Sequence, residues 1–509
     1  MSGADPAPAA RTPTTPLPGW VATGATFLSS GAVLVLEIVG LRLIAPYVGV
    51  TLQTSTAVIG FALAAIALGA WTGGAVADRV DPRRLVVPLM VAGGALVIAV
   101  LPLVRFTGSA VSGADAGAVL LLAAVAVVVP AALLSAVPPM VVKLQLSDLD
   151  ETGAVVGRLS GIGTLGAIAA TFVTGFLLIA VLPSSVILVG TGAVTVLAGL
   201  VVWLVLRRGP GARRAPVALV VLAVAGSVLA AVAPTPCEEE TAYHCARVEA
   251  DPERDSGRVL VLDTLRHSYV DLADPTHLEF EYVRAIAAVT DVLAPAGEPL
   301  SALHLGGGGL TLPRFLAEVR PGTVSRVVEV DPGVVDVDRE QLGLETSEAL
   351  RVDVADGRVG LTEEPAGERD LVVGDAFGGL SVPWQLTTRE AVQLVDRALA
   401  DDGVYAVNLI DNPPLDFVRA ELATLRTVFD HVALLARIPV LTGEDGGNVI
   451  AVASQRPLDG AAIAAAMTGR DLAWRVAEGA QVDEFVGDAP VLTDDHAPVD
   501  QLLTPYGRP

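Results

Sequence analysis

The sequence is poor in positive charge. Its 509 residues include 33 Lys and Arg against 56 Asp and Glu, and Lys143 is the only lysine. Residues 1–233 hold 12 basic and 8 acidic residues, whereas residues 234–509 hold 21 basic and 48 acidic ones. Nucleic acids are bound through clustered Lys and Arg. The acidic half is therefore a poor match for nucleic acid and attracts polycationic molecules instead.

Cysteine and histidine are also scarce. The two cysteines, Cys237 and Cys245, lie eight positions apart in one short segment. Such a pair can form a disulfide in an oxidising compartment or stay as two thiols on a reducing face. None of the six histidines has the spacing of a metal-ligand set, so we expect each to be structural and predict no metal site.

Apolar residues are abundant, in contrast, at 52% of the sequence with a mean hydropathy of +0.60. Glycine and alanine recur inside the apolar runs, as at 69–73 and 161–166, which favours close contact between helices in a bundle. We predict seven spans of membrane-crossing length, near 21–44, 54–77, 85–104, 117–142, 159–182, 186–206 and 215–233.

These patterns divide the chain into five regions. We expect a disordered tail at 1–19, a membrane domain of about seven helices at 20–233 and a linker at 234–257. A β-hairpin and helix lead-in at 258–292 then precede an α/β domain at 293–509. The predicted fold class is thus a multi-pass α-helical membrane bundle followed by a Rossmann-like domain of the S-adenosylmethionine methyltransferase type, with a small β-hairpin region at its start.

Two charged features stand out in the membrane half. Glu37 and Arg42 lie within or at the end of the first span, where they either fix one helix to another or serve a function. Residues 74–84, which include Asp78, resemble the loop motif of major facilitator transporters, in which Asp and Arg clamp neighbouring helix ends. Seven spans fall short of the twelve of that family, so transport is not the favoured function.

Basic residues predict the orientation of the bundle. They gather in the loops after spans two, four and six and are almost absent from the alternate loops. This asymmetry places the N-terminus in the cytoplasm of a cell-membrane protein. With seven spans, the acidic domain would lie outside the cytoplasm, a placement that suits a disulfide between Cys237 and Cys245. An eighth span, or a re-entrant segment broken at Pro138-Pro139, would return it to the cytoplasm.

The acidic half is organised around residues 301–310, an apolar run that ends in Gly306, Gly307, Gly308 and Gly309. Helical spacing follows over 311–319, and the next apolar run ends at Glu329 and Asp331. A glycine turn, a helix, a strand and an acid that can accept ribose hydroxyls make the first half of a nucleoside-binding βαβ unit. A plain structural turn is the alternative.

Further strands are predicted at 350–354, 370–373, 403–409 and 448–453, with a helix at 388–399. Glu329, Asp356 and Asp375 each follow one of these strands or end it. Because a doubly wound sheet binds its ligand at the carboxyl ends of its strands, the three acids can converge on one crevice.

Six motifs occur in the order found in one enzyme family: Leu262-Asp263, Glu279-Phe-Glu-Tyr282, Gly306–Gly309, Glu329-Val-Asp331, Asp356-Gly357 and Asp375-Ala376. In this order and spacing they resemble the spermidine synthase family of aminopropyltransferases. The resemblance covers roughly residues 258–455. With the apolar half, the chain is similar to bacterial multi-pass members in which a transporter-like half is fused to a spermidine synthase-like half.

The resemblance implies roles for these residues. Glu329 would hold the ribose of a decarboxylated S-adenosylmethionine cosubstrate, or of S-adenosylmethionine, and Asp356 would accept from its adenine. Asp375 would be the catalytic acid that orients and deprotonates the amine, and Tyr282 would line the amine side. The remaining cofactor-binding positions would be Gly306, Gly307, Gly308, Asp331 and Gly357. The expected partners are a small-molecule amine and the lipid bilayer, and a homo-oligomer is left open.

The chain departs from the family pattern on the amine side. Gly309 stands where the family usually has an Asp that contacts the aminopropyl tail, and Gly378 stands where a second acid is usual. Two alternatives to a membrane-bound aminopropyltransferase therefore stay open. One is a methyltransferase that uses S-adenosylmethionine, and the other is a transporter or sensor that binds a nucleoside or polyamine without turnover.

Overall fold

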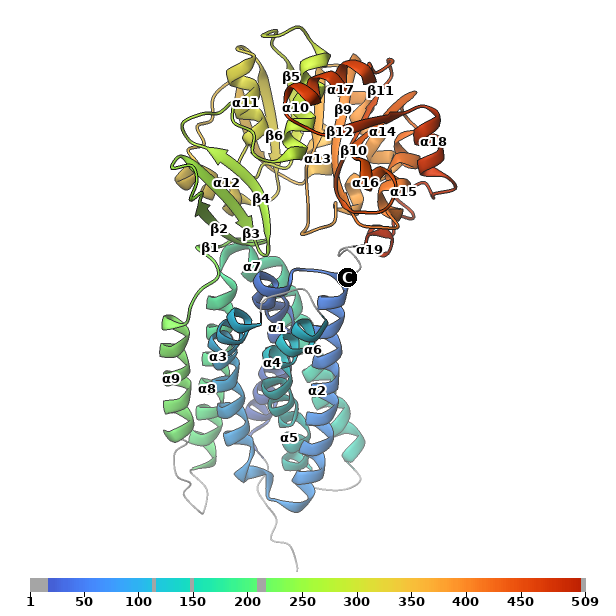
Figure 1. Ribbon diagram of the computed structural model, residues 1–509. Helices are drawn as coiled ribbons and strands as arrows, with labels where there is room; N and C mark the ends of the chain where they lie inside the picture. Colours follow the sequence, from blue (N-terminus) through green and yellow to red (C-terminus); the bar gives the residue numbers. More distant parts are fainter. Residues whose placement is uncertain (1–16, 112–115, 147–150, 208–216, 505–509) are drawn as a thin grey trace, which may run out of the picture. The chain divides into compact units, whose positions relative to one another are not determined.

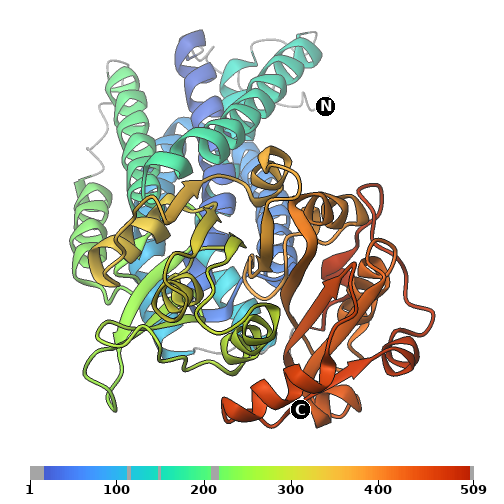
Figure 2. The ribbon, with the colours of Figure 1, turned by 90° about the horizontal axis from the view of Figure 1, so that it is seen from above.

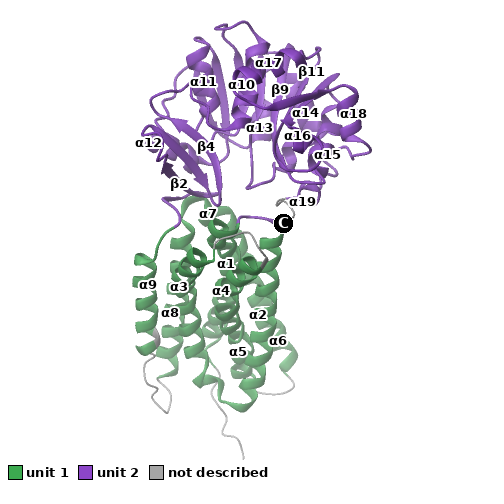
Figure 3. Cartoon of the chain, viewed as in Figure 1, with its two compact units in different colours: residues 1–48, 53–235 green, residues 49–52, 236–509 purple. Residues whose placement is uncertain are grey.

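The computed structural model describes residues 17–111, 116–146, 151–207 and 217–504. The described residues form two compact units (Figures 1 and 3). Unit 1 comprises residues 1–48 and 53–235, and unit 2 comprises residues 49–52 and 236–509. The N-terminal tail expected to be disordered lies mostly outside the described residues, as do Arg208, Arg213 and Arg214 of the orientation argument.

Unit 1 is helical throughout its described residues. Its main helices are α1 (Gly19–Val48), α2 (Leu52–Arg79), α3 (Val86–Ala110), α4 (Ala116–Ser135), α5 (Val137–Gln145), α6 (Thr152–Val173), α8 (Ser184–Leu206) and α9 (Val217–Val232). Short helical turns occur at η1 (Pro82–Arg84), η2 (Thr174–Leu178) and α7 (Ile179–Val181). Helix α1 packs against α4 and α6, and α3 packs against α8 and α9.

Six helical segments of the described chain are long and apolar enough to cross a membrane. They are Gly19–Val48, Leu52–Ala77, Pro82–Ala110, Gly117–Gln145, Thr152–Val181 and Ser184–Leu206. The seventh expected span differs, because α9 has 16 residues. At 1.5 Å per residue it is about 24 Å long, less than the hydrocarbon core of about 30 Å. Near Pro138-Pro139 the helix is interrupted between α4 and α5, within one apolar segment.

Small residues bring the helices of unit 1 into close contact. A Cβ added to Gly69 would lie 2.2 Å from the carbonyl oxygen of Ala132, and one added to Gly166 would lie 2.3 Å from that of Phe27. The expectation that these glycines sit at helix interfaces is thus confirmed. Two polar contacts join helices as well: Arg42 Nε donates to Ser184 Oγ at 3.0 Å, and Lys143 Nζ lies 2.8 Å from Asp78 Oδ1.

Unit 2 begins with a four-stranded antiparallel sheet. Its strands are β1 (Glu239–Glu240), β2 (Cys245–Ala250), β3 (Gly257–Leu262) and β4 (Leu265–Asp271), in that order across the sheet. The segment expected to be a linker, 234–257, therefore contains two strands, and the expected hairpin is only half of this sheet. The acids of these strands hid them in the sequence, because Glu239 and Glu249 are exposed while Cys245 and Ala246 are buried.

The second sheet has eight strands in the order β12-β10-β11-β9-β8-β5-β6-β7 (Figure 2). Their bounds are β5 (Ser301–Leu305), β6 (Val324–Glu329), β7 (Leu350–Val354), β8 (Arg369–Gly374), β9 (Leu399–Asp411), β10 (His431–Arg437), β11 (Gly447–Ser454) and β12 (Trp474–Glu478). Strands β5 to β9 pair in parallel, and β11, β10 and β12 pair antiparallel. The predicted strands are all present. The expectation that the strand at 448–453 is the last is corrected by β12.

Helices cover both faces of this sheet. They are α10 (Glu281–Leu293), α11 (Thr311–Val319), α12 (Pro332–Gln341), α13 (Gly357–Glu363), α14 (Arg389–Ala398), α15 (Asp416–Leu425), α16 (Ile438–Leu441), α17 (Gly460–Gly469), α18 (Ala480–Val486) and α19 (Val499–Leu502). Successive strand residues point to opposite faces. Thus Leu303 packs with α14 and α15, and Ala302 packs with α10 and α11.

Candidate active site

The glycine turn after β5 gives the site a floor of bare backbone. Gly306 has a φ of +102°, and a Cβ there would lie 2.2 Å from the carbonyl oxygen of Asp375. A Cβ on Gly307 would meet the Cβ of Glu329 at 3.0 Å. Only glycine fits the first position, because both its φ and its close neighbour exclude a side chain. The turn thus keeps the ends of β5, β6 and β8 close together.

Glu329 ends β6 beside this turn. Its Oε2 accepts the N–H of Gly307 at 2.7 Å, and its Oε1 accepts the N–H of Asp331 at 2.9 Å. Burial raises the pKa of the Glu329 carboxyl, while the two backbone hydrogen bonds act in the opposite direction. The carboxylate is therefore held in one orientation, with further lone pairs available to accept hydroxyl groups.

Asp356 follows the next strand, β7. The N–H of Ala355 donates to the carbonyl of Glu329 at 2.9 Å, which brings this strand end beside β6. Asp356 caps α13, because its Oδ1 accepts the N–H groups of Arg358 and Val359 at 2.8 and 3.2 Å. Gly357 is the first residue of that helix. The cap fixes the Asp356 carboxylate and leaves Oδ2 to take another donor.

Asp331 has a different place from the one expected for a ligand-binding acid. It is fully buried and caps α12, with Oδ1 accepting the N–H of Gly333 at 3.0 Å. The Thr241 hydroxyl donates to Oδ2. Both of its oxygens are thus engaged inside the protein, and its contact with Glu329 runs through its own N–H.

Asp375 lies just beyond β8, opposite the glycine turn. Its Oδ1 accepts the side-chain N–H of Asn408 at 2.9 Å, and the Asn408 Oδ1 accepts that of Asn448 at 2.9 Å. The Tyr282 hydroxyl, from the first turn of α10, is also hydrogen-bonded to Asp375 and lies 3.3 Å from the His267 carbonyl. Burial raises the pKa of Asp375 to about 6, and the bonds from Asn408 and Tyr282 oppose that rise.

These groups border a cavity of about 690 Å³. Gly306, Gly307, Gly308, Tyr282 and Asp375 line it. Glu329 and Asp356 are not among its lining residues, and Glu329 connects to it through Gly307. The structure therefore brings the catalytic candidate, the amine-side tyrosine and the glycine turn together, with the two remaining acids at the adjoining strand ends.

Several lining residues were not expected from the sequence. His267 and His304 are buried, and burial lowers their pKa values to about 4 and about 3. Their Nε2 atoms have no hydrogen-bond partner among the described residues. Asn408, Asn448 and Arg437 enter from β9, β11 and β10. The signal for Asn408 and Asn448 was a single polar residue within an otherwise apolar strand.

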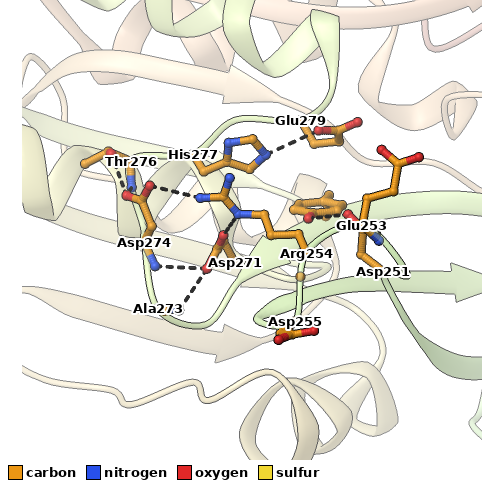
Figure 4. A network of polar contacts seen from close by, with 12 residues as sticks. Asp251, Glu253, Arg254, Asp255, Asp271, Ala273, Asp274, Thr276, His277 and Glu279 are labelled. Atoms are coloured by element: carbon orange, nitrogen blue, oxygen red, sulfur yellow. Dashed lines mark hydrogen bonds and ion pairs between the residues drawn. The ribbon is translucent and has the colours of Figure 1, made fainter.

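The rim of the cavity is fixed by a polar network before α10 (Figure 4). Arg254 pairs with Asp271 and lies 3.2 Å from Asp274. His277 Nε2 lies 3.2 Å from Glu279 Oε2, and Glu279 lines the cavity. The network thus ties the β2–β3 turn to the loop that carries the amine-side motif at 279–282.

Hydroxyl groups occupy the position where the family has an acid. Gly309 has a φ of +73°, and a Cβ there would lie 2.4 Å from Ser268 Oγ. Ser268 Oγ is 2.8 Å from Thr311 Oγ1, and both residues line the cavity. The N–H of Gly309 donates to Asp338 at 3.0 Å. An aspartate at 309 would therefore not fit without moving β4. Within the described ranges, no group of three or more His, Cys, Asp or Glu residues could hold a metal ion.

No protein-family profile matches the chain. Among curated proteins, it is 32% identical over 169 residues to the polyamine aminopropyltransferase of Chromobacterium violaceum, and 32% identical over 152 residues to that of Vibrio vulnificus. These matches cover 32% and 30% of this chain, and 63% and 49% of the relatives. The eEF1A lysine and N-terminal methyltransferase of Bos taurus is 30% identical over 141 residues, which are 26% of this chain and 20% of that protein.

Two solved structures are similar to the chain. A probable spermidine synthase from Corynebacterium glutamicum has a TM-score of 0.48 and 29% identity, covering 50% of this chain and 95% of that one. Human methyltransferase-like protein 13 has a TM-score of 0.32 and 22% identity, covering 44% and 100%. By sequence, the C-terminal half of the chain is similar to polyamine aminopropyltransferases over about half to three fifths of their length.

Proposed function

We propose that unit 2 is an aminopropyltransferase that moves an aminopropyl group from decarboxylated S-adenosylmethionine to a small amine. The observation that carries the proposal is Asp375, which lines the cavity directly opposite the glycine turn and is oriented by Asn408. Its position and the similarity to polyamine aminopropyltransferases support the same assignment.

The residues of the site suit the two substrates. The bare backbone at Gly306–Gly308 would lie under the adenosyl group, Glu329 would accept the ribose hydroxyls and Asp356 would accept from the adenine. Asp331 and Gly357 would support these acids as parts of their helix caps. The amine would enter beside Tyr282, with Asp375 as the acceptor of its proton.

The reaction needs only a base and correct placement. An ammonium ion has no lone pair, so it must lose a proton before it can attack carbon, and Asp375 can take that proton. The amine nitrogen then forms a bond to the aminopropyl carbon as the carbon–sulfur bond breaks, and its electron pair stays on sulfur. Because the sulfonium charge makes the thioether a good leaving group, the chain needs no covalent nucleophile.

A methyltransferase is the second candidate, favoured by Gly309 and by the similarity to the bovine methyltransferase. Neutral Ser268 and Thr311 line the cavity where an acid would grip an ammonium tail. Such hydroxyls would accept the tail of intact S-adenosylmethionine as well. The full chain in detergent, incubated with either sulfonium compound and a panel of amines, would yield aminopropylated or methylated products, which mass spectrometry tells apart.

Unit 1 is proposed to hold the enzyme at a lipid bilayer through its six long apolar helices. A transporter or sensor that binds without turnover would give no product in the same experiment. The outward placement of unit 2 stays a prediction. Seven crossings would put the two ends of the chain on opposite sides, and six, with α9 not crossing, would put them on the same side.

A further inference from the structure

Residues 237–245 form a small closed loop, here called the disulfide loop, because Cys237 and Cys245 are bonded to each other. The loop contains β1 and Thr241, which is buried. The Thr241 hydroxyl accepts the N–H of His244 at 2.8 Å and donates to Asp331 Oδ2. One side chain thus joins the loop to the acid segment that follows β6.

The loop fits closely against the start of α12. A Cβ on Gly333 would lie 2.7 Å from both Cβ and Cγ2 of Thr241. Glycine at 333 therefore makes room for Thr241, and the neighbouring Asp331 receives its hydroxyl. Asp331 in turn donates its N–H to Glu329 Oε1 at 2.9 Å. The contacts run without a gap from the loop to the carboxylate assigned to the ribose.

The other end of the loop is fixed to the β3–β4 turn. Asp263 Oδ1 accepts the N–H of Cys245 at 3.1 Å, and Asp263 Oδ2 lies 3.0 Å from His244 Nδ1. The Asp263 N–H donates to the Cys245 carbonyl at 2.8 Å. The disulfide ties Cys237 to this anchored end, which restricts the conformations available to Thr241 between them.

We infer that Thr241, held in place by the Cys237–Cys245 disulfide, is a positioning residue for the adenosyl-binding acid Glu329. This inference rests on the proposed adenosyl site. Without the hydroxyl, the buried Asp331 carboxylate loses a donor and the segment 329–331 relaxes. Glu329 is then no longer held ready for the ribose, and binding must supply the cost of ordering it.

The test measures binding of methylthioadenosine to the full chain in detergent by calorimetry. Thr241→Val keeps the shape and removes the hydroxyl, and we expect about tenfold weaker binding, the effect of one hydrogen bond. Thr241→Ser restores the hydroxyl and should bind like the unsubstituted protein. Thr290→Val is the matched control, because Thr290 is buried in α10 and its hydroxyl donates only to the Ala287 carbonyl.

Dithiothreitol supplies the second arm. It gives two electrons and two protons to the disulfide, leaves two cysteine thiols and closes to its own cyclic disulfide. Reduction should weaken binding to the unsubstituted protein by a similar factor. It should add little in Thr241→Val, because both changes act through one contact and are therefore not additive.

Each outcome decides the inference. Equal affinity of Thr241→Val and the unsubstituted protein, or equal weakening by Val and Ser, would overturn it while leaving the adenosyl site intact. Binding that is absent from the unsubstituted protein would refute the adenosyl site and this inference together. If Thr241→Val does not fold, complete reduction of the folded protein decides, since unchanged affinity would overturn the inference and a tenfold loss would support it.

Discussion

Replacing Asp375 with Asn should abolish most turnover and at the same time stabilise unit 2 at neutral pH. Asn has the same shape but cannot take a proton from the amine, so we expect transfer to fall at least about a hundredfold. Binding of methylthioadenosine should change little, because Asp375 faces the amine side. The assay is product formation by mass spectrometry at saturating substrates, with calorimetry for binding.

The stability effect follows from the pKa of Asp375, which burial raises from 3.8 to about 6. Between these values the folded state holds a proton that the unfolded state has lost, so stability falls as pH rises through this window. Two pKa units correspond to at most about 3 kcal/mol at pH 7, and residual solvent contact of the half-buried carboxylate reduces this figure. Asn avoids the cost, and the gain should vanish below about pH 4.

Thermal unfolding at pH 8 and at pH 4 measures the gain. Asp402→Asn is the control, because Asp402 is exposed at the start of β9. Turnover of the unsubstituted protein should also fall about tenfold for each pH unit below about 6, as the carboxylate takes up a proton. Near-normal turnover of Asp375→Asn would refute the assignment of the base. Equal unfolding temperatures of Asp375→Asn and the unsubstituted protein at pH 8 would refute the electrostatic reasoning.

Three further predictions concern the cosubstrate side and the membrane. Glu329→Ala should weaken binding of methylthioadenosine by about 1.5–3 kcal/mol, the range for hydrogen bonds to a charged group, and unchanged affinity in calorimetry would remove the ribose assignment. Gly306→Ala should weaken the same binding more than tenfold, about 1.4 kcal/mol or more, because the new Cβ would displace the Asp375 backbone; Gly297→Ala, at a positive φ with open space around it, controls for the backbone strain, and equal effects would contradict the steric argument. A membrane-impermeant thiol reagent should label Cys237 and Cys245 on intact cells only after reduction if unit 2 lies outside the cytoplasm, whereas labelling that appears only after lysis would place it inside.

Much of the fold of unit 2 could be read from the sequence. The runs ending at Leu305, Glu329 and Val354 are apolar, short and followed by glycine or an acid, which is how parallel strands that are buried on both faces look in a sequence. Their order alone then brought Glu329, Asp356 and Asp375 to the same edge of the sheet.

The parts that the sequence concealed have physical reasons. Asn408 and His304 lie within strands whose other residues are core, so nothing local showed that these positions face a cavity. Strand β2 carries exposed charges because it forms part of a small sheet, and its acids resemble those of a linker. Asp331 could have been recognised as a helix cap, since Asp331-Pro332 is the usual start of a helix, with Pro at the first helical position.

The identity of the co-product tests the central claim most directly. The full chain in detergent is incubated with decarboxylated S-adenosylmethionine and a panel of di- and polyamines, and in parallel with intact S-adenosylmethionine. The account predicts methylthioadenosine together with an aminopropylated amine in the first reaction, and loss of both in Asp375→Asn. S-adenosylhomocysteine with a methylated acceptor in the second reaction, and no aminopropylated amine in the first, would contradict it.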